Sequence, residues 1–140
     1  MQRAPEPSGE QLARAWFEHS PLIRALGMRL ASITSDEATV ALPYREELAT
    51  AGDIVHGGAI MSLLDTAAAL AAWSAHDPGK GVRWGTVSVS VSFLASAQGR
   101  DLEATARVTR RGRSICFCRV EVSDSERTPV AEALVSYRLG

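Results

Sequence analysis

The feature that most constrains this chain is an apolar segment, residues 59–75, which carries a single ionisable side chain, Asp65. Ala and Leu, the strongest helix formers, dominate the segment, and apolar residues occupy nearly every side of the helix that they predict. The segment is shorter than the roughly 20 apolar residues that cross a bilayer, and an acid lies near its middle. It therefore predicts a long helix buried inside a domain and not a membrane span.

The rest of the chain is typical of β-strands. Between residues 87 and 93, Val and Phe alternate with Ser at a period of two, the pattern of a strand with one buried face. Similar runs occur at 28–34, 38–44, 102–109, 114–122 and 130–139. Because the links between the later runs are short, these strands are expected to be antiparallel neighbours. The pattern predicts an α+β fold in which an antiparallel sheet of about five to six strands curls around one long central helix.

The chain is expected to divide into an N-terminal extension, residues 1–20, and a single domain, residues 21–140. Within the extension, residues 10–19 predict an amphipathic helix whose apolar side is formed by Leu12, Ala15, Trp16 and His19. The first residues have neither the basic start nor the apolar core of a signal peptide. This favours a cytoplasmic protein.

Composition and charge exclude several classes of function. The chain has 140 residues, of which 46% are hydrophobic and 22% charged, as in ordinary globular domains. Its net charge of −1 gives no electrostatic reason to expect a nucleic acid or an anionic membrane as partner. Cys116 and Cys118 have no partner cysteines with which to form a zinc site, so we expect two buried, reduced thiols and no metal.

Two glycines stand at the start of the long helix, in the sequence Val55-His56-Gly57-Gly58. Without side chains there, another group can approach the free backbone N–H donors of the first helical turn, where the helix dipole adds partial positive charge. A carbonyl oxygen that becomes negative in a transition state is stabilised by such donors. Close packing or a tight turn is the alternative explanation of the glycine pair.

Asp65 is the second candidate for a chemical role. Because an unpaired carboxylate in an apolar environment costs several kcal/mol, a helix with only a structural role would carry Leu or Ala there. We expect a nucleophile or general base facing a cleft; a carboxylate satisfied by Thr66 or by a facing strand is the alternative. In one helix, Gly57 and Asp65 are separated by about 12 Å along the axis. If both act on one carbonyl, two copies of the helix related by a two-fold axis must contribute, which predicts a homodimer or a dimer of dimers.

The residues His56-Gly57-Gly58, followed after six positions by Asp65-Thr66-Ala67, resemble the PaaI-type hotdog-fold acyl-CoA thioesterases, which include enzymes for 4-hydroxybenzoyl-CoA and phenylacetyl-CoA. The resemblance extends from residue 22 to residue 139. It implies that an acyl-CoA thioester is hydrolysed without a metal or cofactor. It also implies that the Gly57 N–H polarises the carbonyl, that Asp65 of the partner chain attacks it or activates water, and that Thr86 positions this water. Many relatives have Asn or Gln about six positions before the His, where this chain has Thr50.

Further candidates for substrate binding are spread over three segments. Arg110, Arg111 and Arg113 surround Gly112 in a predicted turn, and Arg is suited to the phosphates of CoA, although such clusters are often only solvated. Trp84 either packs in the core or lines the acyl pocket. The remaining candidates are His56, Gly58 and Thr50.

The expected activity is that of a thioester hydrolase, acting on an aryl-acyl or medium-chain acyl-CoA. Two alternatives remain open. One is a protein that binds or senses acyl-CoA without catalysis, which Thr50 in place of an amide residue leaves open, although such a protein would not require a buried Asp65. The other is an enoyl-thioester hydratase, which the nine-residue separation of His56 and Asp65 argues against.

Overall fold

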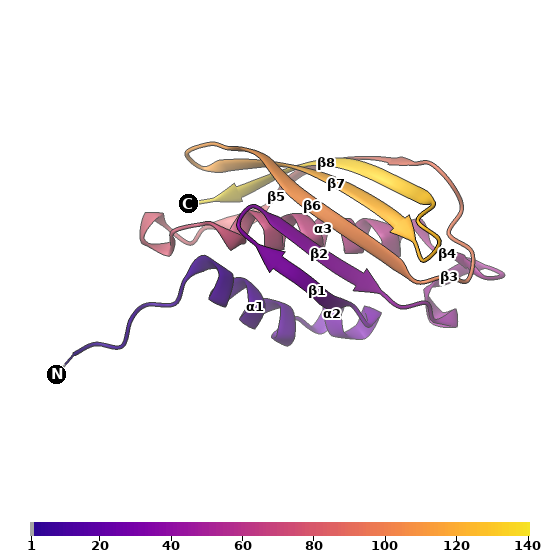
Figure 1. Ribbon diagram of the computed structural model, residues 1–140, viewed down its shortest axis with the longest axis horizontal. Coiled ribbons are helices and arrows are strands. Elements are labelled where there is room, and N and C mark those ends of the chain that lie inside the picture. Colours follow the sequence, from indigo (N-terminus) through magenta and orange to yellow (C-terminus); the bar gives the residue numbers. More distant parts are fainter. Residues whose placement is uncertain (1) are drawn as a thin grey trace.

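The computed structural model describes residues 2–140 and shows a strongly curved sheet that wraps around one long helix (Figure 1). The sheet is antiparallel and its strand order is β1-β2-β6-β7-β8-β5. The strands are β1 (Arg29–Thr34), β2 (Glu37–Leu42), β5 (Trp84–Phe93), β6 (Leu102–Arg111), β7 (Ile115–Asp124) and β8 (Pro129–Leu139). The prediction of an α+β fold with five to six antiparallel strands around a central helix is therefore confirmed, with six strands in the sheet.

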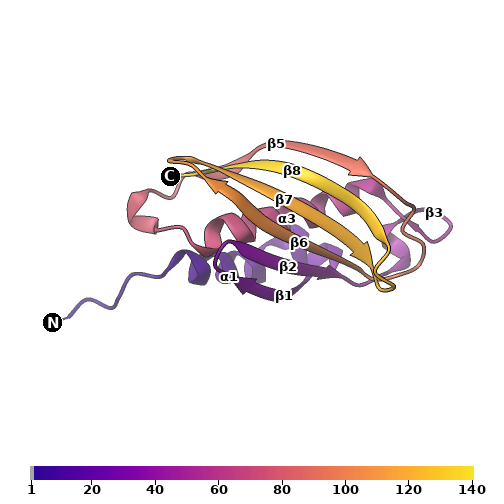
Figure 2. The same cartoon turned by 45° about the horizontal axis from the view of Figure 1, so that its top comes forward.

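The central helix α3 (Gly57–Ser74) lies against the concave side of the sheet, as Figure 1 and Figure 2 both show. Its Ala and Leu side chains pack against β2, β6, β7 and β8 and are almost completely buried. One side of the first half of α3 is not buried in this way. Gly58, Met61, Ser62 and Asp65 are exposed or only partly covered, and Met61 is 41% exposed. This open face of α3 corrects the prediction of a helix buried on nearly every side, because the sheet does not close around it.

Strand β5 forms one edge of the sheet and runs beside α3. It pairs with β8 on one side only, with a bulge between Thr86 and Ser88. Trp84, Val87 and Phe93 are exposed large apolar side chains on this strand. An edge strand with free backbone groups and exposed apolar side chains is a surface on which another chain can pair.

The first N-terminal helix packs against α3. Helix α1 (Gly9–His19) confirms the helix predicted there, but its predicted apolar side was partly wrong. Ala13 and Phe17 are buried, whereas Ala15 and His19 are exposed. The buried positions follow a spacing of four, and α3 contacts that side of the helix. Residues 9–19 thus share the core of the rest of the chain.

Helix α1 approaches α3 so closely at Gly9 that this position has no room for a side chain. A Cβ atom at this position would collide with the backbone carbonyl oxygens of Trp73 and His76 at the end of α3. The short helix α2 (Pro21–Leu26) then leads into β1 and ends at Gly27, whose φ of 76° lies in the left-handed region that favours glycine.

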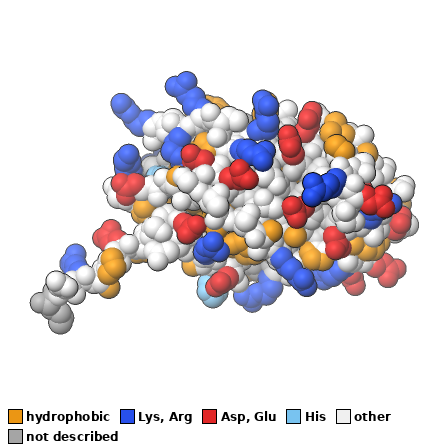
Figure 3. Space-filling view, viewed as in Figure 1, with side chains coloured by type: hydrophobic (Ala, Val, Ile, Leu, Met, Phe, Trp, Pro, Cys, Tyr) orange, Lys and Arg blue, Asp and Glu red, His pale blue; other side chains and the backbone are white. Residues whose placement is uncertain are grey.

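Short elements connect the sheet to α3 on both sides. Before α3 come η1 (Glu46–Leu48) and a small hairpin of β3 (Ala49–Ala51) and β4 (Ile54–Val55), and after it comes η2 (Pro78–Lys80). Among residues 2–140, no helix has the length and apolar character that crossing a bilayer requires. Acidic and basic side chains alternate over the face shown in Figure 3, where no patch of one sign dominates.

Candidate active site

The Asp65 carboxylate is held by a strand residue. Thr86 on β5 donates a hydrogen bond from its Oγ1 to Asp65 Oδ1, with a distance of 2.6 Å. Thr86 pairs with the buried Tyr137 of β8, so its side chain lies on the concave side of the sheet and faces α3. Asp65 itself is only partly covered. The structure therefore brings two of the predicted site residues together and leaves the carboxylate accessible from the open face of α3.

At the start of α3, His56 and the two glycines have different roles. His56 is the N-cap, and its Nδ1 accepts the Gly58 N–H at 2.8 Å. This donor of Gly58 is thus already used inside the chain. The Gly57 N–H is the first of the helix and has no carbonyl one turn earlier to bond to. Among residues 2–140, no acceptor lies within hydrogen-bond distance of it.

Gly57 also lies against an aromatic ring of β5. A Cβ atom at position 57 would lie 3.4 Å from Cζ of Phe93, which is a tight but not prohibitive contact. The sheet edge therefore follows α3 along its length, with Phe93 beside Gly57 and Thr86 beside Asp65. Sequence patterns gave no signal for the position of Phe93, because the register of an edge strand against a helix is a tertiary property.

The separation between Gly57 and Asp65 is that of one continuous helix, because both lie in α3. Eight residues at a rise of about 1.5 Å give about 12 Å along the axis. A donor and a carboxylate that act on one carbonyl must each lie within hydrogen-bond reach of it. One chain alone does not bring them together.

Trp84 lies in a hollow at the other end of α3, together with five other residues. The hollow has a volume of about 360 Å³ and is lined by Leu12, Trp16, Trp73, Val82, Trp84 and Tyr137. We call it the aromatic hollow. The rings of Trp16 and Trp84 lie 6.5 Å apart, centroid to centroid, so α1 and β5 meet across it. The concentration of tryptophan is the one sequence signal for it, because all three tryptophans of the chain are here.

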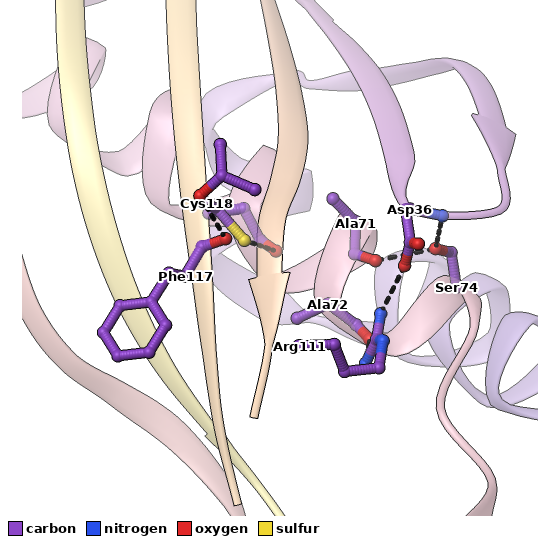
Figure 4. A network of polar contacts seen from close by, with 9 residues as sticks. Asp36, Ala71, Ala72, Ser74, Arg111, Phe117 and Cys118 are labelled. Atoms are coloured by element: carbon purple, nitrogen blue, oxygen red, sulfur yellow. Dashed lines mark hydrogen bonds and ion pairs between the residues drawn. The ribbon is translucent and has the colours of Figure 1, made fainter. Parts of the chain in front are cut away.

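The turn between β6 and β7 separates its three arginines. Arg111 donates from Nη1 to the Ala72 carbonyl at 2.9 Å and from Nη2 to Asp36 Oδ1 at 2.7 Å (Figure 4). It therefore joins the β1–β2 turn to the end of α3 and is not a free phosphate ligand, which changes the role predicted for it. Arg110 and Arg113 are exposed.

Thr50 is exposed on β3, in the hairpin before α3. Among residues 2–140, its side chain has no hydrogen bond to Gly57 or Asp65. The hairpin holds the start of α3 through the His56 N–H, which donates to the Leu48 carbonyl at 2.8 Å. In the described part of the chain, Thr50 therefore does not hydrogen-bond to the carboxylate.

The two cysteines of β7 are buried and free, as predicted. Cys118 donates a weak hydrogen bond from Sγ to the Ala68 carbonyl of α3 at 3.8 Å. The neighbouring Cys118 thiol lowers the pKa of Cys116 in spite of burial, whereas the Cys116 thiol and burial together raise the pKa of Cys118. Within residues 2–140, no group of three His, Cys, Asp or Glu side chains is arranged to hold a metal ion.

Comparison with known proteins gives the family. The sequence profile of the thioesterase superfamily matches residues 52–131, which include Gly57 and Asp65. The medium/long-chain acyl-CoA thioesterase YigI of Escherichia coli is 30% identical over 135 residues, 87% of each chain. The acyl-coenzyme A thioesterase PaaI of E. coli is 28% identical over 122 residues, 86% of this chain and 84% of PaaI. The solved structure of E. coli PaaI superposes with a TM-score of 0.82 over 94% of this chain and 93% of PaaI, at 24% identity. The chain therefore belongs to the thioesterase superfamily and has its hotdog fold.

Proposed function

We propose that this protein is an acyl-CoA thioesterase, which hydrolyses the thioester of an aryl or medium-chain acyl group to the free acid and CoA. The observation that carries this proposal is the Asp65 carboxylate, bonded at 2.6 Å to Thr86 and accessible from the open face of α3. The relatives with 30% and 28% identity, YigI and PaaI, are named for acyl-CoA hydrolysis.

The chemistry starts at the thioester carbonyl. Asp65 either adds to the carbonyl carbon or takes a proton from a water that adds to it, and in both routes negative charge develops on the carbonyl oxygen. The Gly57 N–H, which is free and lies at the positive end of the α3 dipole, stabilises this oxygen in the proposed mechanism. The C–S bond then breaks, and CoA leaves as a thiol: its sulfur takes a proton from solvent in the first route and the proton that Asp65 took from water in the second. In the first route, water hydrolyses the acyl–Asp65 anhydride.

The complete site is proposed to form between two chains. Gly57 and Asp65 lie about 12 Å apart in one helix, so a second α3, antiparallel to the first, must bring its Gly57 to Asp65. Two exposed features support this arrangement: the open face of α3, with Met61 at its centre, and the unpaired edge of β5 beside it. Both would be covered in a dimer.

The roles of the other candidate residues follow from their positions. Thr86 positions Asp65 or its water, and His56 holds the start of α3 by capping it. Arg110 and Arg113, but not Arg111, are proposed to contact the phosphates of CoA. Thr50 and Gly58 contribute at most to the surface around the helix start, because Thr50 is exposed and the Gly58 donor is used by His56.

The test is release of free thiol from a panel of acyl-CoAs by the wild type and by Asp65→Asn. The variant should retain the fold and acyl-CoA binding and lose at least about 10²-fold in rate. The matched control is Asp53→Asn, which removes an exposed carboxylate of the β3–β4 turn and should leave the rate unchanged. A wild type that binds acyl-CoA but releases no thiol would overturn the proposal in favour of a binding protein. Full activity of Asp65→Asn would remove this residue from the mechanism.

A further inference from the structure

The aromatic hollow is an apolar recess, and it is built by elements far apart in the sequence. Helix α1 contributes Leu12 and Trp16, α3 contributes Trp73, and β5 and β8 contribute Trp84 and Tyr137. No charged side chain lines it. Its volume of about 360 Å³ falls in the range of about 300–1,000 Å³ found for small-molecule pockets.

The hollow begins next to the carboxylate. Trp84 precedes Thr86 by two positions on β5, so the two side chains leave the strand on the same side, about 7 Å apart along it. Tyr137, which lines the hollow, is the direct cross-strand partner of Thr86. The Asp65 charge is also close enough to Tyr137 to raise the pKa of its hydroxyl, in addition to the larger effect of burial.

Two polar groups at the base of the hollow, the Trp73 indole N–H and the Tyr137 hydroxyl, bond to each other. Trp73 donates from Nε1 to Tyr137 Oη at 3.2 Å, so the indole N–H needs no partner from a ligand. Apart from the Tyr137 hydroxyl and the indole N–H groups of Trp16 and Trp84, a ligand that enters the hollow meets aromatic and aliphatic surface. Such a lining favours an apolar group and disfavours the phosphates or the pantetheine amides of CoA.

A second hollow, of about 340 Å³, lies at the start of α3 beside Leu22, His56 and Gly58. The Glu47 carboxylate lines it, so an apolar group there would lie against a charge. The aromatic hollow has no such group. Of the two recesses, it is the better site for an apolar ligand.

We propose that the aromatic hollow holds the acyl group of the thioester on which Asp65 acts, and that Trp16 and Trp84 select an acyl group larger than acetyl. This inference rests on the proposed thioesterase function. Helix α1 lies outside residues 52–131, the part of the chain that matches the superfamily. The residue that closes the hollow over the acyl group, Trp16, thus comes from a segment that the family match does not cover.

The first test compares acyl preference. Trp16→Ala and Trp84→Ala should lower kcat/KM for octanoyl-CoA and phenylacetyl-CoA by at least about tenfold relative to acetyl-CoA, because the lost contacts serve only the longer acyl groups. Leu134→Ala is the matched control. Leu134 lies on the outer side of the sheet, away from the hollow, and its exposed fraction of 57% is close to the 58% of Trp84. The control should keep the wild-type ratio. If a Trp→Ala variant does not fold, Trp16→Phe and Trp84→Phe should shift the ratio in the same direction.

Unchanged ratios in all folded Trp variants, with an active wild type, would overturn the inference and leave the thioesterase function intact. A change of oligomeric state in Trp16→Ala without a change of acyl preference would mean that the hollow is covered by a second copy of the chain. A wild type without hydrolytic activity would instead contradict the proposed function, so the two failures are distinguishable.

The second test needs no turnover. Because all three tryptophans line the hollow, the intrinsic fluorescence of the protein reports on this place alone. In Asp65→Asn, octanoyl-CoA should shift or quench the tryptophan emission, and CoA without an acyl group should not. Equal effects of both ligands would place the acyl group elsewhere and overturn the inference.

Discussion

Thr86 Oγ1 and Asp65 Oδ1 are joined by a hydrogen bond of 2.6 Å, which links the edge strand β5 to the middle of the central helix. The acceptor is a carboxylate, which makes the bond a charge-assisted one. Because Oδ1 accepts from Thr86, Oδ2 is the Asp65 oxygen that stays free. That free oxygen is the one available to the carbonyl or to water. The orientation of the carboxylate in the proposed site therefore depends on a strand that follows α3 in the chain.

Thr86→Val should test this dependence, because it keeps the branched shape and removes the hydroxyl. We expect kcat to fall by about tenfold with KM within about twofold of the wild-type value, since the lost bond orients Asp65 and does not bind substrate. Thr86→Ser, which restores a hydroxyl, should recover most of kcat. Steady-state kinetics with one good acyl-CoA measures both. Equal losses in the Val and Ser variants would show that the position matters through packing.

Arg111 should contribute to the stability of the fold. Its guanidinium bonds the Ala72 carbonyl and Asp36, and the Asp36 N–H in turn donates to Ser74 Oγ at 2.8 Å, so the β1–β2 turn is held to the end of α3 (Figure 4). Arg111→Ala should lower the free energy of unfolding by about 1–3 kcal/mol, measured by urea denaturation. Arg113→Ala, in the same turn, should lower it by less than about 0.5 kcal/mol. Similar losses in both variants would contradict the structural role of Arg111.

Arg110 and Arg113 should increase the affinity for the substrate. Replacing both by Ala should raise KM for acyl-CoA with little change in kcat, because phosphate contacts are the same in the ground and transition states. An acyl-pantetheine substrate, which lacks the nucleotide, should show no change. Equal effects on both substrates would mean that the turn does not hold the CoA nucleotide.

Much of the fold was predictable because its signals are local. The Ala- and Leu-rich segment predicted α3, and the alternation of Val and Ser predicted β5. The carboxylate at position 65 is also a local signal, since one charge in an apolar helix calls for an explanation. That Thr86 belongs to the same site as Asp65, where it was expected to position a water, was reached only through the resemblance to a family. The geometry adds that the two side chains are within hydrogen-bond distance.

The rest depends on contacts between distant segments. Nothing in the turn sequence distinguishes Arg111 from Arg110 and Arg113, because the distinction comes from Asp36, 75 positions away. The buried side of α1 was misassigned because two apolar stripes lie next to each other on that helix, and only the position of α3 selects one. The meeting of Trp16 and Trp84 has the same origin.

Tyr137 gives a dependence of stability on pH. Burial raises the pKa of its hydroxyl from 10.0 to about 12, partly offset by the hydrogen bond from Trp73 and increased by the Asp65 charge. The unfolded chain loses this proton near pH 10.0, whereas the folded chain keeps it to about pH 12. The contribution to stability is therefore fully present below pH 10.0 and is lost as the pH rises through about 12.

Urea denaturation at a series of pH values between about 9 and 11 measures how the free energy of unfolding begins to fall as Tyr137 loses its proton in the unfolded chain. The free energy of unfolding of the wild type should fall more steeply with pH than that of Tyr137→Phe. The comparison uses the slopes, because the Phe variant also leaves the Trp73 N–H without its acceptor and is less stable at every pH. Parallel slopes would contradict the raised pKa.

To test whether two chains share the site, a variant must remove the Gly57 N–H. Gly57→Pro does so, and the local backbone accepts it. Position 57 is the first residue of α3, where Pro is favoured, and His56 has φ −60° and ψ 133°, the conformation that a residue before Pro adopts. Gly57→Ala is the matched control: it keeps the N–H and adds a Cβ atom 3.4 Å from the Phe93 ring. We expect Gly57→Ala to keep most of the activity and Gly57→Pro to lose it while remaining folded and dimeric.

The most direct measurement mixes two inactive proteins, Asp65→Asn and Gly57→Pro, and follows thiol release after subunit exchange. A mixed dimer has one site with both defects and one site with neither, because each site takes Gly57 from one chain and Asp65 from the other. Activity should therefore return to about half of the wild-type value per mixed dimer. Exchange is verified independently with differently tagged chains. A mixture that exchanges subunits and stays inactive would show that Gly57 and Asp65 do not act together across the two chains.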